Sequence, residues 1–316
     1  MRTEEVEQNR NLEPGQRLWE WLDWYEQFGD YVTAQSVRPL CYPRCREQPE
    51  PAGSIVLVHG LSDSPWFLDD IAEFFFSEMG LNVYQPLLQC HGLAEPRQME
   101  GVSLEVWRSN VSWAVERAAA ATPGQVSIGG LSTGGALSVD CALTNAQVTG
   151  GIYLFSAALG LLAGGTGRLA PVFGDVVESM LRTPWLNRFA SRLMHGDEPL
   201  TGPAQVRYEY VALVAAAELA HLIADLEQRW RQGAVLNNPV MVGHSLADAT
   251  ADPGAVMQLR NHIGAQMWRE VVFAPEEAIT HAGLVLANDL YDKHGKLIEP
   301  GNPQLLNMLK KLTKPG

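Results

Sequence analysis

Ser132 stands in the sequence Gly-Leu-Ser-Thr-Gly at residues 130–134, with a glycine two positions before it and another two positions after it. The apolar residues before this motif predict a strand, and residues 133–143 predict a helix. A serine in a sharp turn between a strand and a helix takes a strained conformation, and the glycines let the two elements pass closely. Its hydroxyl is then exposed at the sheet edge, near a helix N-terminus that favours negative charge. The pattern predicts a nucleophilic serine, with an ordinary glycine-rich turn as the alternative.

The four cysteines were considered as ligands and as nucleophiles. Cys41 and Cys45 have the spacing of a ligand pair, but the sequence lacks the second pair that a zinc site needs. Cys90 lies beside His91, so its thiol is a second candidate nucleophile, yet it lacks the strand-turn-helix setting of Ser132. We expect thiols without disulfides, and neither a metal nor an organic cofactor.

Short apolar runs alternate with helix-length segments through most of the chain. Buried strands are predicted at residues 55–58, 81–84, 126–128, 151–155, 240–242 and 270–273. Helices are predicted at residues 66–79, 104–121, 133–143, 208–230, 254–263 and 303–311, the first of them opened by a Ser-Pro cap at residues 64 and 65. Such alternation predicts an α/β protein whose parallel strands are joined by right-handed helical crossovers.

Two segments fall outside this alternation. Residues 16–28 carry apolar side chains on one helix face, which predicts an amphipathic helix before the core. After residue 155, glycines interrupt an apolar stretch, and residues 176–193 then show apolar side chains at helical spacing. We therefore divide the chain into an N-terminal helix and lead-in segment (1–50), an α/β core (51–158 and 206–316) and an inserted helical cap (159–205).

The composition limits the classes of partner. A formal net charge of -13 opposes the phosphate attraction on which nucleic-acid binding depends, and it disfavours anionic membranes as well. No run approaches the roughly 18 apolar residues of a membrane span, and the N-terminus lacks the apolar region of a signal peptide. With 46% hydrophobic residues the chain can bury a sizeable core. We expect a cytoplasmic protein with no stable membrane anchor, a monomer or a homodimer.

Residues 58–64, Val-His-Gly-Leu-Ser-Asp-Ser, follow the first predicted strand. Together with the serine motif they resemble the α/β-hydrolase superfamily, from about Ser54 to the C-terminus. Residues 84–92 and 102–107 are similar to the corresponding loop and helix start of bacterial carboxylesterases and monoacylglycerol lipases, which usually have Gly-His-Gly where this chain has Cys-His-Gly. The resemblance implies a mostly parallel sheet flanked by helices, with a helical cap inserted.

The resemblance also implies where a negatively charged intermediate would be stabilised. In the family, the residue after the His-Gly pair and the residue after the nucleophile each give a backbone N–H to an oxyanion hole, and these residues are Leu61 and Thr133 here. His59 precedes the serine, out of family order for a catalytic base, so we interpret it as structural. We interpret His91 as a residue that organises its loop.

The acid follows from the same resemblance. In these carboxylesterases the acid lies nine residues after one proline and five before another, and this spacing fits Asp248 between Pro239 and Pro253. Asp252 is the reserve candidate. The alternative role for either carboxylate is to cap the following helix.

The catalytic histidine of the family follows the acid in the chain, which leaves His262, His281 and His294. His262 falls inside a predicted helix, and His294 falls in a predicted surface turn. His281 lies in a short loop after the last strand, where the family keeps its base. We therefore expect His281 to be the base, with an exposed loop histidine as the alternative.

The resemblance implies hydrolysis by a Ser-His-Asp triad through an acyl-enzyme, without a cofactor. The apolar residues 157–162 and the predicted cap would suit an aliphatic acyl chain, so short- to medium-chain esters or monoacylglycerols are the expected small-molecule substrates. The same fold also supports thioesterases, peptidases and other hydrolases. A non-catalytic binding protein is the alternative from another class, and the complete candidate triad argues against it.

Overall fold

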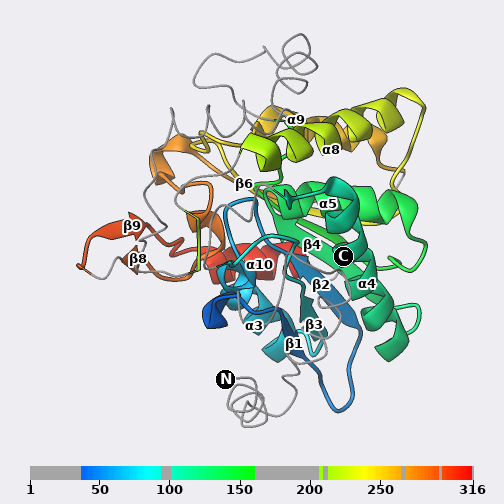
Figure 1. The fold of residues 1–316 in the computed structure, drawn as a ribbon, viewed down its shortest axis with the longest axis horizontal. Helices are drawn as coiled ribbons and strands as arrows, with labels where there is room; N and C mark the ends of the chain where they lie inside the picture. Colours follow the sequence, from blue (N-terminus) through cyan, green and yellow to red (C-terminus); the bar gives the residue numbers. More distant parts are fainter. Residues whose placement is uncertain are drawn as a thin grey trace.

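A seven-stranded sheet with the order β1-β3-β2-β4-β5-β6-β7 forms the centre of the computed structural model (Figure 1). The structure describes residues 37–93, 101–160, 206–208, 213–264, 268–291 and 294–314. The strands are β1 (Arg44–Arg46), β2 (Ser54–Val58), β3 (Asn82–Gln85), β4 (Val126–Leu131), β5 (Ile152–Phe155), β6 (Val240–Ser245) and β7 (Trp268–Phe273). Neighbours from β3 to β7 pair in parallel, and β1 pairs antiparallel with β3. The expected mostly parallel sheet is confirmed.

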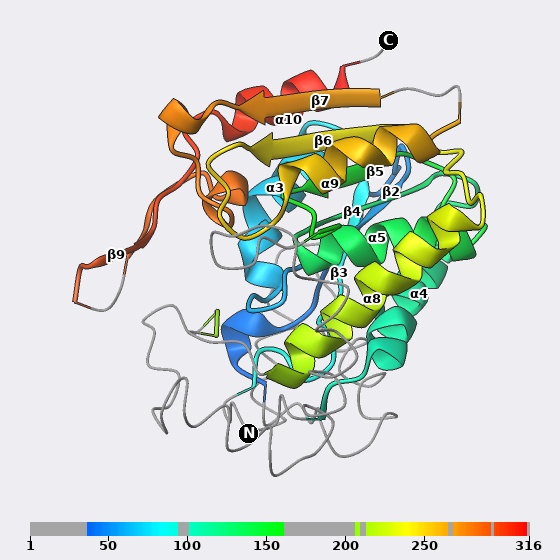
Figure 2. The same cartoon turned by 90° about the horizontal axis from the view of Figure 1, so that it is seen from above.

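Helices cover both faces of the sheet, which explains why its central strands are apolar on both sides (Figure 2). One face packs against α4 (Leu104–Ala121), α5 (Thr133–Thr144), α8 (Leu213–Arg231) and α9 (Pro253–Gln258). The other face packs against α3 (Asp69–Ser77) and α10 (Leu305–Thr313). Along β2, Val56 and Val58 join the first apolar cluster, while Ile55 and Leu57 join the second. This division follows from the alternation of side chains along a strand.

Three of the predicted helices differ in their bounds from the helices in the structure. The helix predicted at residues 66–79 is divided into a short 3-10 turn, η2 (Pro65–Leu68), and α3. The Ser64 side chain makes no cap hydrogen bond. The helix predicted from Tyr208 is described from Leu213, and Tyr208 itself is not helical; its N–H donates to the carbonyl oxygen of Ser62. The helix predicted to reach Ile263 ends as α9 and continues in a 3-10 turn, η4 (Leu259–His262).

Two short strand pairings were not predicted. Strand β1 is three residues long, with Cys45 buried between two half-buried arginines. The arginines pair with Asp69 and Glu73 of α3, and no apolar run marks the strand in the sequence. Strands β8 (Leu290–Tyr291) and β9 (Leu297–Glu299) form an antiparallel hairpin that projects from the body (Figure 1).

The predicted N-terminal helix at 16–28 and nearly all of the predicted cap at 159–205 lie outside the described residues. They therefore stay predictions. No disulfide joins the cysteines, all four of which are buried. Among the described helices, none combines the length and apolar composition that crossing a membrane requires.

Candidate active site

The parallel strands bring the candidate residues to one edge of the sheet. Because β2, β4, β6 and β7 run in the same direction, the loops that follow them share that edge (Figure 2). Leu61 follows β2, Ser132 follows β4, Asp248 follows β6 and His281 follows β7. Residues that are far apart in sequence thus lie at the edge where ligands usually bind in an open α/β sheet.

Ser132 occupies the turn between β4 and α5 with φ 54° and ψ -118°. A positive φ is uncommon outside glycine and is characteristic of strained functional turns. The flanking glycines have no room for a side chain: a Cβ on Gly130 would lie 2.4 Å from the Val58 carbonyl oxygen, and one on Gly134 would lie 1.9 Å from it. The glycines therefore allow β4 and α5 to pass against β2, and the strand-turn-helix prediction is confirmed.

The backbone of Ser132 is fixed on both sides. Its N–H donates to the carbonyl oxygen of Phe155 at 3.0 Å. Its carbonyl oxygen accepts from Gly135 at 2.9 Å and from Ala158 at 3.0 Å. Because these contacts use no side-chain atom of Ser132, the turn depends on the backbone and not on the hydroxyl.

The acid and base candidates are in contact. Nδ1 of His281 lies 2.7 Å from Oδ2 of Asp248, whose other oxygen accepts from the N–H groups of Thr250 at 2.8 Å and Ala251 at 3.0 Å. Burial alone would raise the pKa of Asp248, but these hydrogen bonds, led by that from His281, lower the pKa below its ordinary value. An ionised Asp248 accepts the Nδ1–H of His281, which leaves Nε2 of the imidazole to accept a proton.

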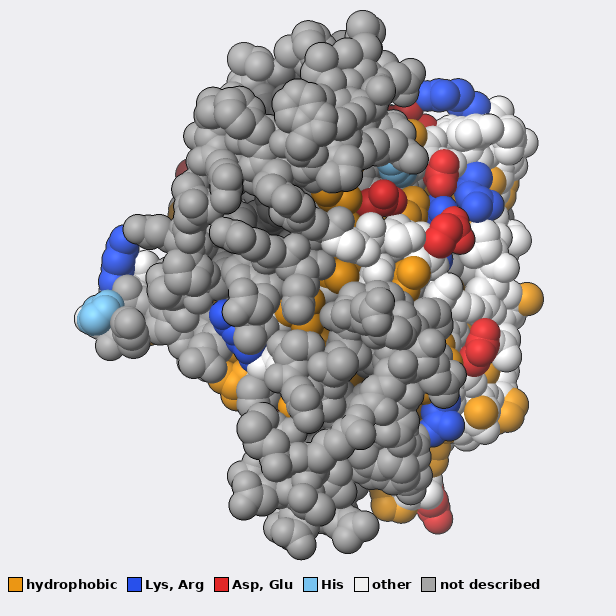
Figure 3. Space-filling model, in the orientation of Figure 1, with side chains coloured by type: hydrophobic (Ala, Val, Ile, Leu, Met, Phe, Trp, Pro, Cys, Tyr) orange, Lys and Arg blue, Asp and Glu red, His pale blue; other side chains and the backbone are white. Residues whose placement is uncertain are grey.

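The reserve candidates have other partners. Asp252 is the N-cap of α9 and accepts from Gly254 N–H at 2.8 Å, which is the capping alternative stated for it. His262 stacks on Trp230 with ring centroids 4.8 Å apart. His294 lies in the turn of the β8–β9 hairpin, which projects from the body in the space-filling view (Figure 3). The structure thus pairs Asp248 with His281.

His59 fixes the peptide that bears the Leu61 N–H. The N–H of Leu88 donates to Nε2 of His59 at 3.1 Å, so the ring proton is on Nδ1, which lies 2.8 Å from the Gly60 carbonyl oxygen. That carbonyl and the Leu61 N–H belong to one peptide unit and point in opposite directions. A Cβ on Gly60 would lie 3.4 Å from Cβ of Ser132, so this peptide lies beside the serine.

The second histidine of this region supports the same loop. Nε2 of His91 lies 2.8 Å from the carbonyl oxygen of Leu61, and its ring meets the ring of His59 edge to face at 4.8 Å. Burial lowers the pKa of His91 as it does that of His59. The other proposed donor, Thr133, is the first residue of α5, where an N–H has no acceptor within its own helix.

Cys90 does not have the properties of a nucleophile. Its side chain is buried, and burial raises the pKa of the thiol to about 12, so the thiol is protonated at neutral pH. The alternative of a thiol nucleophile is therefore not supported. Cys90 also has φ 61°, a left-handed conformation that glycine adopts at no steric cost. This conformation gives a physical reason for glycine at the same position in the proteins that the sequence resembles.

Several residues near the site were not found from the sequence. Arg207 contacts both Asp63 and Glu299, and Glu299 in turn accepts from the hydroxyl of Thr280, the residue before His281. His244 is fully buried, with Nε2 3.7 Å from Oδ2 of Asp248. No sequence motif marks these contacts.

Known proteins resemble this chain in sequence and in fold. Residues 49–276 match the family described as serine aminopeptidase, S33. Similar solved structures include a metagenome-derived lipolytic enzyme, with a TM-score of 0.56 at 19% identity over 79% of this chain and 92% of that one. The monoacylglycerol lipase of Paleococcus ferrophilus has a TM-score of 0.54 at 16% identity, covering 76% and 90%.

A soluble variant of monoglyceride lipase from Saccharomyces cerevisiae, in complex with a substrate analogue, has a TM-score of 0.51 at 13% identity, covering 73% of this chain and 82% of that one. At these identities the likeness establishes the α/β-hydrolase fold. No curated protein matches the sequence.

Proposed function

Because this chain belongs to the serine aminopeptidase S33 family, we propose that it is a serine hydrolase that cleaves carboxylic esters, with Ser132 as nucleophile, His281 as base and Asp248 as the orienting acid. One observation carries the proposal: Nδ1 of His281 lies 2.7 Å from Asp248 at the sheet edge where Ser132 takes a positive φ. A nucleophile in a strained turn and a histidine oriented by an ionised carboxylate are the parts that acyl transfer requires.

In the first half of the reaction, Oγ of Ser132 attacks the ester carbonyl carbon as Nε2 of His281 takes the hydroxyl proton. The carbonyl π electrons move to oxygen, and the N–H groups of Leu61 and Thr133 would bind the resulting oxyanion. Collapse of the intermediate expels the alcohol, which takes the proton from His281 and leaves an acyl-enzyme. Asp248 remains ionised and stabilises the imidazolium.

In the second half, His281 removes a proton from water, and the hydroxide oxygen attacks the acyl carbon. The oxyanion forms again at the same two N–H groups. Collapse then breaks the bond to Oγ of Ser132, which regains its proton from His281, and the carboxylic acid leaves. Each step uses only groups of the chain and water.

Three buried carboxylates near the site have partners within the chain. Asp248 binds His281, while Asp63 and Glu299 share Arg207. None of these three is left to bind a substrate ammonium group. Lipolytic enzymes and monoacylglycerol lipases among the similar structures also support an ester substrate.

An aliphatic acyl chain of short to medium length, or a monoacylglycerol, is the substrate class we propose. Ala157 and Ala158, which follow β5, are buried in the apolar core beside the serine turn. The predicted cap at 159–205 would add further apolar side chains and set the preferred chain length.

Labelling with a fluorophosphonate probe tests the nucleophile, and a panel of p-nitrophenyl esters from acetate to decanoate tests the substrate class. We expect the probe to react at Ser132. We also expect kcat/KM for the p-nitrophenyl esters to exceed kcat/KM for aminoacyl p-nitroanilides. Thioesters of the same acyl chains distinguish a thioesterase. An unlabelled protein with no hydrolysis of any of these compounds would rule out the proposal.

A further inference from the structure

Residues 206–208 join loops that follow two neighbouring strands. The N–H of Tyr208 donates to the carbonyl oxygen of Ser62, in the loop after β2, at 2.7 Å. The hydroxyl of Tyr208 accepts from Leu93 N–H at 3.0 Å and donates to the carbonyl oxygen of Cys90 at 3.1 Å, both in the loop after β3. These hydrogen bonds place Arg207 beside the residues that follow Leu61.

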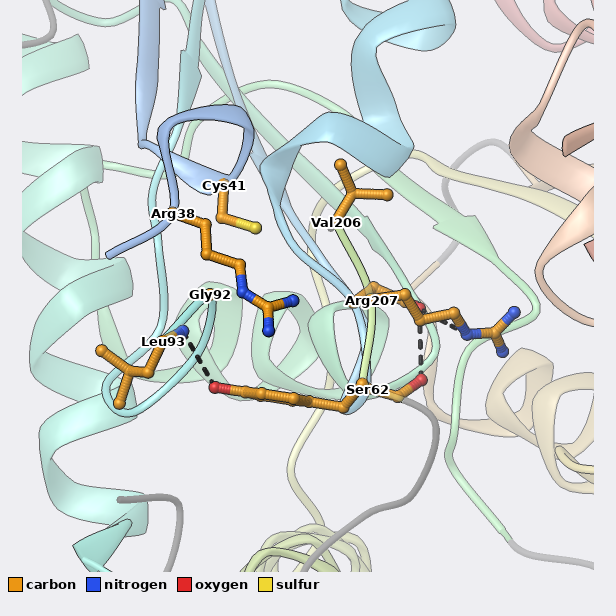
Figure 4. Close-up of a pocket in the computed structure, with 9 residues that line it drawn as sticks. Arg38, Cys41, Ser62, Gly92, Leu93, Val206 and Arg207 are labelled. Carbon is orange, nitrogen blue, oxygen red and sulfur yellow. Dashed lines mark hydrogen bonds and ion pairs between the residues drawn. The ribbon is translucent and has the colours of Figure 1, made fainter. Parts of the chain in front are cut away.

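The Arg207 side chain contacts two buried carboxylates. Nε lies 3.4 Å from Oδ1 of Asp63, and Nη1 lies 2.7 Å from Oε2 of Glu299. The guanidinium also lies over the ring of Phe67, 5.5 Å from its centroid. In Figure 4 the residue borders a small cavity, and its side chain extends away from Arg38. The side chain is thus held from three directions.

Asp63 lies against the peptide of the Leu61 donor. Its N–H donates to the Gly60 carbonyl oxygen at 3.2 Å, and a Cβ on Gly60 would lie 2.4 Å from its Oδ2. Gly60 therefore has no room to move toward the carboxylate. Asp63 and His59 thus both bind the carbonyl oxygen of the peptide between Gly60 and Leu61, and Arg207 contacts the side chain of Asp63.

Glu299 reaches the loop of the base. Its Oε1 accepts from the hydroxyl of Thr280, the residue directly before His281. The Thr280 oxygen in turn accepts from Gly283 N–H at 3.2 Å, which closes the turn containing His281. Arg207 is thereby linked through Glu299 to Thr280, the residue bonded to His281.

We propose that Arg207 is a positioning residue that fixes the Leu61 loop relative to the His281 loop through Asp63 on one side and Glu299 on the other, an inference that depends on the proposed roles of Leu61 and His281. A guanidinium is planar, and its donors are arranged in a rigid fork, so it holds two carboxylates in a fixed relation. An ammonium group on a flexible stem does not hold them in this way. In the tetrahedral state, the oxyanion donor and the base must both lie within hydrogen-bond reach of the same substrate.

The test compares Arg207→Met and Arg207→Lys with the wild-type protein on a p-nitrophenyl ester. Arg231→Met is the matched control, because Arg231 is largely exposed and pairs with Glu227 one turn away. We expect Arg207→Met to lower kcat by about 10- to 100-fold with KM within about threefold, since displacement of a reacting group by about 1 Å has effects of this size. Arg207→Lys should recover only part of the loss, and Arg231→Met should match the wild type.

A boronic acid that mimics the tetrahedral state gives a second readout. Its inhibition constant should rise in Arg207→Met in proportion to the fall in kcat/KM, because both depend on the same alignment. A protein that is merely less stable would show fewer active sites by fluorophosphonate titration, with an unchanged inhibition constant for those that remain. That outcome would overturn the proposal.

Where Arg207→Met does not fold, the two carboxylates are changed instead. Asp63→Asn and Glu299→Gln keep the size of each side chain, and their effects on kcat should be non-additive if one guanidinium couples them. Independent effects would contradict the coupling. A wild-type protein without labelling or hydrolysis would contradict the proposed function, whereas an active wild type with an equally active Arg207→Met variant would contradict only this inference.

Discussion

Asp248 receives the Nδ1–H of His281 at 2.7 Å, although 33 residues separate them in the sequence. Asp252, only four residues after Asp248, has a different role: it caps α9 by accepting a hydrogen bond from Gly254 N–H. The loop after β6 thus holds two carboxylates with different functions. One orients an imidazole, and the other satisfies a helix terminus.

Replacement of each carboxylate by its amide separates these functions. Asp248→Asn should lower kcat by roughly 10³- to 10⁴-fold, because an amide cannot stabilise the imidazolium and favours the wrong tautomer. Asp252→Asn should leave kcat within about threefold and stability nearly unchanged, because asparagine caps a helix as well as aspartate does. Steady-state kinetics with a p-nitrophenyl ester measure both variants. Comparable losses in the two would contradict the assignment, and a larger loss in Asp252→Asn would transfer the role to Asp252.

Ser132→Ala should abolish hydrolysis while leaving the thermal unfolding midpoint close to that of the wild type. Loss of a nucleophile of this kind costs roughly a millionfold in kcat. The fold should persist because the turn is held by backbone hydrogen bonds, and alanine has the same Cβ as serine. Ser156 provides the control, since it is buried nearby and also has a positive φ, of 43°. Ser156→Ala should keep its activity; a Ser132→Ala variant with near-normal turnover would refute the mechanism.

The parts of this structure that sequence predicts well are those with local causes. The bounds of α4, Leu104–Ala121, agree with the prediction because its apolar spacing lies within one segment. The turn at Ser132 is equally local, since its glycines, strand and helix are contiguous. Strands that are buried on both faces were also predicted from their short, continuous apolar segments.

The parts that were missed depend on contacts between distant segments. The ion pair of Arg207 with Glu299 spans 92 residues, and neither residue stands in a recognisable motif. Tyr208 begins a segment that predicts helix, but the residue is not helical and bonds through its N–H and hydroxyl to the loops after β2 and β3. Tertiary hydrogen bonds of this kind override local propensity, and a single sequence does not encode them as a pattern.

The conformation of Cys90 leads to a prediction about stability. With φ 61°, a side chain at this position is strained, and glycine relieves the strain. Cys90→Gly and Cys90→Ala both remove the buried thiol, so the comparison between them isolates the backbone effect. We expect the glycine variant to be more stable by about 1 kcal/mol in urea unfolding. Both variants should hydrolyse esters normally; a more stable alanine variant would show that the left-handed conformation is not maintained.

The buried histidines predict how stability depends on pH. His59, His91 and His244 are fully buried, and burial lowers the pKa of each below its ordinary value. In the unfolded chain these groups titrate near 6.5, so below that pH the unfolded state binds protons that the folded state does not. The free energy of unfolding should therefore fall as the pH is lowered from 7 to 5. Each histidine contributes up to about 1.4 kcal/mol per pH unit in that range.

His244 is the clearest of the three to test, because neither ring nitrogen has a hydrogen-bond partner among the described residues. His244→Gln removes the titrating group, so the slope of unfolding free energy against pH should decrease between pH 7 and 5. His294→Gln is the control, since His294 is exposed in the hairpin turn and its replacement removes no buried group. Urea denaturation at pH 7, 6 and 5 gives the slope for each of the three proteins, the wild type and the two variants. The same slope in His244→Gln as in the wild type would mean that His244 is protonated in the folded protein, against the burial on which the prediction is based.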